Sequence, residues 1–237
     1  MNNDILVRGS KGKGGGGSAP TEDDNTLFSE STARIVDLVS EGEIVGLVNG
    51  GHSIFLDETP LLDSAGGSNF DEVTYITRPG TNSQAYIQGF AGAETERVVN
   101  QKVENGDPGP VVKTVFGGTL DALRVTMYVP RLTFQDEKGS MHGSSVSFKI
   151  EIERDNNGHW IEKVVSSFDG KCTSRYERAY RIEIPTDWKT EGFSQITIKV
   201  TRTTADADDS QTSNDLYFGT YAIIIDNKLR YPNSAII

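Results

Sequence analysis

Residues 123–129, LRVTMYV, alternate apolar and polar side chains, and residues 146–153, VSFKIEIE, repeat the pattern. A period of two residues is that of a β-strand with one face buried and the other in water. Antiparallel strands of this kind stack as two sheets, so the sequence predicts a mainly β fold built around a β-sandwich. The same alternation predicts strands at 160–165, 180–184 and 196–200, and shorter apolar runs predict strands at 73–78, 94–103 and 111–116.

A further strand is predicted near the C-terminal end. Residues Leu216–Ile225, LYFGTYAIII, are apolar on both faces, which is typical of a strand at the centre of a sheet or between two domains. The preceding stretch, Ala205–Asp215, is acidic and poor in apolar residues, and it is interpreted as a linker. We therefore expect residues 216–237 to return to the part of the chain that precedes the sandwich.

The part before the sandwich shows one helix pattern and two hairpin patterns. Ser31–Val39 offers an N-cap hydroxyl followed by clustered apolar residues, which predicts a short helix. From Glu43 onward, short β-rich runs are separated by Asn49-Gly50 and by Asp57-Glu58, and both dipeptides favour tight turns. The sequence thus predicts one short helix and two successive hairpins.

Residues 1–25 have few side chains that could join a core. Gly12-Lys13-Gly14-Gly15-Gly16-Gly17-Ser18 is followed by the acidic Glu22-Asp23-Asp24. Such a composition buries too little apolar area to offset the entropy of ordering. We expect a flexible, Gly-rich N-terminal arm that orders only against a partner surface.

Charge and cysteine content exclude several classes of protein. The chain of 237 residues carries a net charge of −11, which does not favour general nucleic-acid binding. The single cysteine, Cys172, forms no internal disulfide and is interpreted as a reduced structural thiol. No run of about 18 apolar residues predicts a membrane span, and no signal peptide is evident.

No constellation of residues predicts catalysis or metal binding. His52, His142 and His159 are expected in exposed turns, and none has a second ligand at metal-binding spacing. Glu151 and Glu153 fall on one solvent face of a strand, which suits surface charge better than an acid/base pair. We expect no enzyme activity, no cofactor and no bound metal.

Residues 36–63, VDLVSEGEIVGLVNGGHSIFLDETPLLD, resemble the opening of the tail tip attachment protein J family of lambda-like bacteriophages. The resemblance is carried by Ser40-Glu41-Gly42 and by Leu56-Asp57-Glu58-Thr59-Pro60-Leu61. Residues 123–160 look like the family's inserted sandwich, which is fibronectin-like, and YAIIIDNKLRYPNSAII at 221–237 resembles the return of the chain to the hub.

The resemblance implies a structural role. Members of this family form a trimeric hub that joins the tail tube to the central fibre, so it implies a homotrimer in contact with other tail tip proteins. It places the protein in the virion tail tip after synthesis in the host cytoplasm, with genomic DNA passing nearby without specific binding. Family members are several times longer, so this chain matches the N-terminal portion of one or a split version, and host receptor binding is expected to lie beyond it.

We divide the chain into an arm (1–25), a first hub part (26–90), an inserted sandwich (91–215) and a strand that returns to the hub (216–237). A carbohydrate- or receptor-binding β-sandwich is the alternative, and clustered exposed aromatic residues beside Asn or Asp would favour it. Interface contacts are expected from the second hairpin, from the last strand and from the C-terminal segment. The candidate residues are Ile54, Phe55, Leu56, Leu61, Leu62, Leu216, Phe218, Tyr221 and Tyr231.

Overall fold

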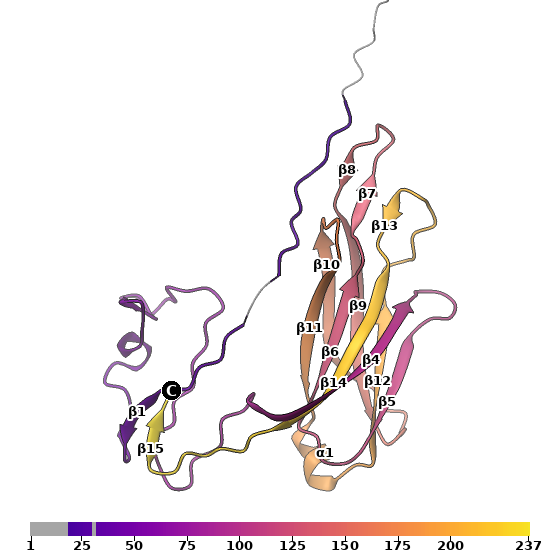
Figure 1. Ribbon diagram of the computed structural model, residues 1–237. Coiled ribbons are helices and arrows are strands. Elements are labelled where there is room, and N and C mark those ends of the chain that lie inside the picture. Colours follow the sequence, from indigo (N-terminus) through magenta and orange to yellow (C-terminus); the bar gives the residue numbers. More distant parts are fainter. Residues whose placement is uncertain (1–18, 30–31) are drawn as a thin grey trace, which may run out of the picture.

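The computed structural model describes residues 19–29 and 32–237 and contains a β-sandwich beside a smaller unit (Figure 1). Each sheet of the sandwich has four strands, and every pairing is antiparallel. One sheet has the order β11 (Tyr176–Glu183), β6 (Ala122–Val129), β14 (Leu216–Asp226) and β4 (Ala91–Val103). The other has the order β10 (Ile161–Gly170), β9 (Ser144–Arg154), β12 (Gln195–Arg202) and β5 (Val111–Phe116). The mainly β fold and the sandwich are confirmed.

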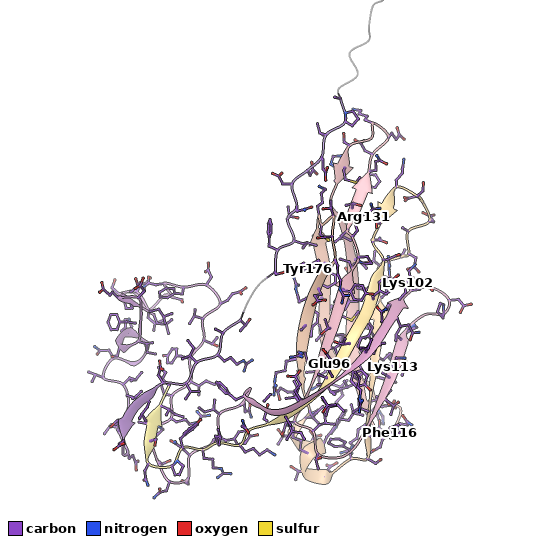
Figure 2. All side chains as sticks on the ribbon, in the orientation of Figure 1. Glu96, Lys102, Lys113, Phe116, Arg131 and Tyr176 are labelled. Carbon is purple, nitrogen blue, oxygen red and sulfur yellow. The ribbon has the colours of Figure 1, made fainter. Side chains whose placement is uncertain are left out.

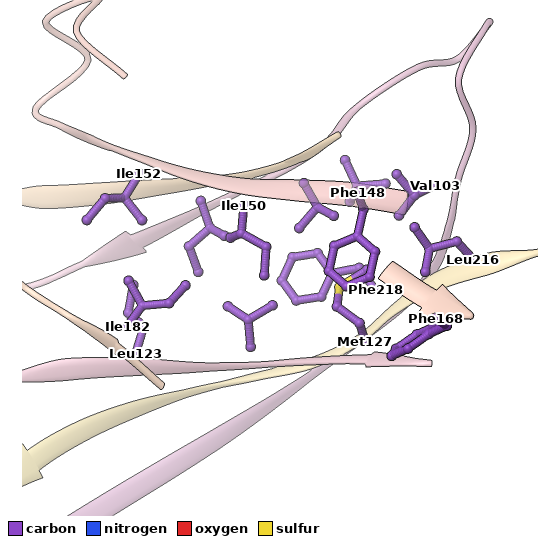
Figure 3. Close-up of a cluster of buried hydrophobic side chains, with 14 of the residues drawn as sticks. Val103, Leu123, Met127, Phe148, Ile150, Ile152, Phe168, Ile182, Leu216 and Phe218 are labelled. Atoms are coloured by element: carbon purple, nitrogen blue, oxygen red, sulfur yellow. The ribbon is translucent and has the colours of Figure 1, made fainter. Parts of the chain in front are cut away.

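The core lies between the two sheets and is formed by the apolar positions of the alternating strands (Figure 3). On β6, Leu123, Val125 and Met127 are fully buried, as the period of two predicts. Aromatic rings fill the centre, where the Phe148 and Phe168 rings lie 5.5 Å apart at an angle of 59°. Such tilted packing is a favourable arrangement of aromatic rings.

The strand β14 is central in its sheet, between β6 and β4, as its two apolar faces predict. It is a strand of the sandwich, however, and does not return to the hub. The sandwich therefore extends past the expected boundary at residue 215, and the chain leaves it only after Asp226. The stretch 205–215, interpreted as a linker, is a loop within the sandwich that contains β13 (Thr212–Ser213).

Short elements complete the sandwich at its two ends. Strands β7 (Thr133–Gln135) and β8 (Met141–His142) join β13 in a small sheet. The helix α1 (Thr186–Glu191) closes the opposite end, where it buries Trp188. The sequence did not predict α1, because six residues after Pro185 are too short for a helical period to show.

Residues 32–90 and 227–237 form what we call the small unit. Its strand β1 (Leu38–Glu41) pairs with β15 (Ser234–Ile236). The first and last segments of the unit are therefore adjacent in space, although the whole sandwich lies between them in the sequence. A single hairpin joins β2 (Phe55–Leu56) to β3 (Thr59–Pro60) after the 3₁₀ turn η1 (Gly50–Ser53). Its turn, Asp57-Glu58, has positive φ at both residues, as a tight hairpin requires.

The helix predicted at Ser31–Val39 is wrong. Residues 32–37 are irregular and Leu38 begins β1. Ile35 and Leu38 are 72% and 62% exposed, so the apolar stripe of a helix would find no surface to pack on. Pairing with β15 satisfies the backbone instead. The strands predicted at 43–48 and 73–78 are also absent, so only the second of the two hairpins is confirmed.

Candidate assembly interface

Large apolar side chains that stay exposed are concentrated in the small unit and the segment leading into it. Thirteen of the twenty such side chains among the described residues lie there. In contrast, the described residues of the small unit include only three buried hydrophobic side chains, those of Leu61, Ala235 and Ile236. Contiguous exposed apolar surface marks an interaction site in a soluble protein. The thirteen are Phe28, Ile35, Leu38, Val39, Val45, Val48, Phe55, Leu56, Val73, Tyr75, Ile76, Leu229 and Tyr231.

One part of this surface is hollow. A cavity of about 160 Å³ opens between the segment after β1 and the loop before Gly80. That volume is close to the roughly 150 Å³ of an apolar cavity that holds a benzene ring. The cavity is suited to one apolar side chain of a partner. It is lined by Val39, Ile44, Val45, Gly46, Leu47, Thr77, Arg78, Pro79 and Ile236.

Hydrogen bonds from a buried glutamine side chain to the backbone, and not a core, hold this surface in shape. The side chain of Gln84 is buried; its Oε1 accepts from Gly80 N at 2.8 Å and its Nε2 donates to Arg230 O and Tyr231 O, each at 2.7 Å. Gly80 has φ of +95°, and a Cβ there would lie 2.7 Å from Gly42 O. The loop 79–85 is thereby fixed to the C-terminal segment and presents the apolar side chains on a defined frame.

A second surface lies at the far end of the sandwich, where residues 20–27, which we call the strap, run along β8. Met141 N donates to Thr21 O at 2.8 Å, and Asp23 N donates to Met141 O at 2.9 Å. Farther on, Thr26 N donates to Lys171 O at 3.0 Å. Residues 19–25 of the predicted arm thus dock on the chain's own sandwich, which corrects the expectation of a flexible arm there. Residues 1–18 lie outside the described residues.

The strap covers a buried lysine. Lys171 is 2% exposed, and its Nζ donates to Glu22 Oε1 at 2.7 Å and to Asp23 O. A buried ammonium group is tolerated only when it is paired, and the strap supplies both partners. A Cβ at Gly170 would collide with Thr26 Oγ1, so a glycine is needed for the close approach. We call residues 140–142 and 170–173 the seat of the strap.

His142 connects the strap to the β7–β8 turn. Its Nδ1 lies 2.9 Å from Asp23 Oδ2 and its Nε2 lies 3.5 Å from Asp136 Oδ2. The hydrogen bond with Asp23, followed by that with Asp136, raises the pKa of His142 above its ordinary value. Asp136 has a lowered pKa because Ser140 N donates to it and because His142 lies beside it. Protonation of His142 therefore strengthens docking of the strap.

We expect docking of the strap to weaken as the pH rises. Because the pKa of His142 is raised in the docked state, its contribution is fully present below about 6.5, the value of a free imidazole, and is lost as the pH rises through the raised pKa. The measurement is hydrogen-exchange protection of the Asp23 and Thr26 amides from pH 5.5 to 8.5, corrected for intrinsic exchange. His142→Gln is the control and should flatten the profile. Protection that is independent of pH in the unmodified chain would contradict the assignment.

Comparison with known proteins identifies the family. Residues 93–227 match the family described as Tip attachment protein J, FNIII-A domain. The chain belongs to the tip attachment protein J family. It is 34% identical over 238 aligned residues to Tip attachment protein J of Escherichia phage SECphi4, and 30% identical over 232 to that of Escherichia phage SECphi27. Each alignment covers 98% of this chain but only 20% and 19% of those proteins, so the chain spans about a fifth of their length.

The match from residue 93 to 227 coincides with the sandwich from β4 to β14, so the sandwich is the FNIII-A domain of the J family. Among solved structures, a carbohydrate-binding module from glycoside hydrolase family 9 (Cel9A) of Ruminococcus flavefaciens FD-1 is similar, at 10% identity and a TM-score of 0.36. It covers 61% of this chain and 100% of the module. A similarity of this size carries no argument about function.

The structure divides the nine residues expected at an interface of this J-family chain into two groups. Leu216 and Phe218 are fully buried in the sandwich core and Leu61 is 3% exposed, so these three are unavailable to a partner, which corrects that expectation. The cause is that Leu216 and Phe218 lie in the core between the two sheets, whereas Leu61 is buried within the small unit. The other six keep a possible interface role: Ile54, Leu62 and Tyr221 are half-buried, and Phe55, Leu56 and Tyr231 are exposed.

Sequence reasoning missed most of the exposed apolar surface, including Val45 and Val48, which are 110% and 93% exposed. Their run, EIVGLV, is one of the short β-rich runs from which the first of the two hairpins is predicted. The signal that could have found them is the glycine content of this stretch, at Gly42, Gly46, Gly50 and Gly51, because glycine weakens a strand and leaves the neighbouring side chains without a sheet to pack on.

No catalytic or metal arrangement appears in the J-family chain within residues 19–29 and 32–237. No group of three His, Cys, Asp or Glu residues there could hold a metal ion. Cys172 is buried and its pKa is raised by burial, which keeps the thiol protonated and unreactive. No helix in the same residues has the length and apolar character needed to cross a membrane.

Aromatic residues of the sandwich surface do not form an open platform. The Tyr128 and Tyr217 rings stack 4.9 Å apart, and the Arg175 guanidinium lies 3.9 Å from the centre of the Tyr128 ring. Tyr128 is 7% exposed as a result. Phe116 is exposed, but it lies at the end of the sandwich near α1 (Figure 2). Tyr128, Tyr217 and Phe116 thus form no cluster of exposed aromatic rings that would favour the carbohydrate-binding alternative.

Proposed function

We propose that this chain is the hub region of a phage tail tip protein, in which three copies surround an axis and join the tail tube to the central fibre. The observation that carries the proposal is the exposed apolar surface of the small unit and of the segment leading into it, where thirteen large apolar side chains have no cover in a single chain. Burial of such a surface between copies, and against neighbouring tail proteins, provides the affinity for assembly.

The relatives support the location. Both are named Tip attachment protein J and come from phages that infect Escherichia. The chain accordingly acts in the virion tail after synthesis in the host cell, and it contributes contacts instead of a chemical reaction. Host receptor binding belongs to segments beyond the length that this chain shares with them.

Charge is consistent with passage of DNA without binding. Each copy carries a net charge of −11, so three copies around an axis present a strongly negative assembly. Like charge repels a phosphate backbone and favours transit over adhesion. Genomic DNA thus passes near the hub without a specific contact.

The test is the mass of the purified chain in solution. Light scattering at increasing protein concentration should give a mass of three chains, and addition of apolar-binding dyes should label the monomer more strongly than the assembly. A monomer at every concentration, together with failure to copurify with tail proteins from infected cells, would overturn the proposal.

A further inference from the structure

The connection between the strap and the small unit is weakly held. No backbone–backbone hydrogen bond involves residues 28–29 or 32–36, the described part of this connection. Phe28 and Ile35 are 69% and 72% exposed. The packing that is present is modest, since the Arg34 side chain lies against Gly89. In Figure 1 residues 32–37 run to β1 in an extended form.

An extended connection of this kind is stabilised by few contacts with the rest of its own chain. Fixing a residue's backbone costs about 1–2 kcal/mol in conformational entropy, and this segment has neither hydrogen bonds nor a buried apolar face to offset it. The strap, in contrast, is held through specific contacts with residues more than 115 positions away, such as Thr21 with Ser140 and Asn25 with Thr173. The strap therefore binds its seat independently of where the connecting chain leads.

We propose that the strap is exchanged between copies in the assembly, so that residues 20–27 of one chain occupy the seat of a neighbouring chain. The inference rests on the proposed trimer. Exchange of an identical element keeps every contact of the strap, including the pairing of Lys171 with Glu22, and therefore costs no interaction energy. It adds a link between copies, and it brings Phe28 and Ile35 across to a neighbour that can cover them.

The length of the connection sets a limit on the geometry of exchange. Asp37 is fixed in the small unit, because its backbone N donates to Ile237 O at 2.9 Å. Leu27 N donates to Lys171 O at 3.2 Å, which fixes the other end. Ten residue-to-residue steps lead from Leu27 to Asp37, and a fully extended chain of that length reaches about 33–36 Å. The seat of the neighbouring sandwich must lie within this distance of the small unit.

The experiment uses one cysteine on each of two chains. Asn25 and Thr173 are both exposed and their side chains form a hydrogen bond of 3.3 Å, which is separate from the side-chain hydrogen bonds of Lys171 and His142. N25C and T173C are produced in separate chains, each also carrying C172A to remove the native thiol, and one chain carries an affinity tag. The two chains are co-produced, purified as the assembly and oxidised.

Exchange predicts a disulfide-linked species with the summed mass of the two chains, which disappears on reduction. The matched control places V165C and K149C in separate chains, because these cross-strand partners in β10 and β9 belong to one sandwich and cannot meet between chains. A chain carrying both N25C and T173C should form covalent multimers. If it closes within a single chain while light scattering still shows a trimer, exchange is overturned and the trimer stands. A monomer by light scattering would overturn both.

Discussion

Replacement of Arg202 by alanine is expected to lower the free energy of unfolding of the sandwich by about 3–5 kcal/mol. Arg202 is the largest side chain in the described structure that is essentially fully buried, at 1% exposed. A loss of this size approaches a large part of the stability of a typical domain, so much of the variant should be unfolded at 37 °C.

The expected loss follows from what the guanidinium holds. Arg202 Nη1 donates to Asn214 O at 3.0 Å, and Nη2 donates to Ala205 O at 2.9 Å and to Asn214 Oδ1 at 2.8 Å. Arg202 Nε donates to Thr204 O at 2.9 Å and lies 3.2 Å from Asp206 Oδ1. Removal of the side chain leaves the buried Asn214 carbonyl and the buried Oδ1 atom of Asp206 without this partner, and each such group costs about 1–3 kcal/mol.

Loss of Arg202 also affects the loop between β4 and β5, through Asp206. Asp206 Oδ2 accepts from Asn105 N at 2.8 Å and from Gly106 N at 3.3 Å, in the crossing between β4 and β5. Arg202 thus joins the loop before β14 to the connection between the two sheets. Burial lowers the pKa of Arg202, and the nearby Asp206 opposes this shift, so the guanidinium stays charged at neutral pH.

Urea denaturation followed by tryptophan fluorescence measures the change, since Trp188 is buried in α1 at one end of the sandwich. Arg97→Ala is the matched control, because Arg97 is an exposed residue of β4 in the same sandwich and its loss should change stability by less than about 0.5 kcal/mol. Equal midpoints for the two variants would show that the Arg202 contacts do not stabilise the fold.

The sandwich could be predicted because each of its main strands shows a local alternation of apolar and polar residues. Ile196, Ile198 and Val200 alternate inward, and Arg202 occupies the next inward position, so the sequence period even indicates that this arginine is buried. What the sequence does not show is its partner, because Asn214 and Ala205 belong to a loop with no periodic pattern. That loop was interpreted as a linker for the same reason.

The small unit could not be predicted in the same way, because its pairing is non-local. Leu38 pairs with Ile236 almost two hundred positions away, and no local pattern reports such a contact. The local pattern at Ser31–Val39 instead favoured a helix. In a unit with so little core, helix propensity has no packing to support it, and the backbone pairs with the C-terminal strand.

Burial within the chain removes three of the nine candidate interface residues, and the other six stay a prediction, for a related reason. Apolar character identifies residues that avoid water, but it does not say whether their own chain or another one covers them. Phe55 and Phe218 look alike in sequence; the first is 58% exposed on a two-residue strand and the second is fully buried in the sandwich. Docking of the strap was not predicted because it depends on polar contacts with Lys171 and His142, which a polar sequence does not reveal.

Substitution of Val45 and Val48 by aspartate is expected to weaken self-association by about 100-fold or more while leaving the sandwich unchanged. The two side chains are 110% and 93% exposed, so a single chain loses no buried area when they are replaced, and its stability should change by less than about 0.5 kcal/mol. In an assembly that covers them, each carboxylate would be buried without a partner. Losses of about 2 kcal/mol or more per central position are common at interfaces, and 1.4 kcal/mol corresponds to tenfold in affinity.

The measurement pairs sedimentation equilibrium, which gives the association constant, with urea denaturation of the dilute chain. Val165→Asp is the matched control, because Val165 is 70% exposed on β10 of the sandwich and lies outside the small unit. The two variants add the same kind of charge at exposed valines, so a difference between them reports where copies meet. If V45D/V48D chains assemble as tightly as V165D chains, the small unit is not the surface through which the hub forms. A lower association constant for V45D/V48D alone, with an unchanged free energy of unfolding, would instead mean that the exposed apolar side chains serve assembly and that the sandwich folds without them.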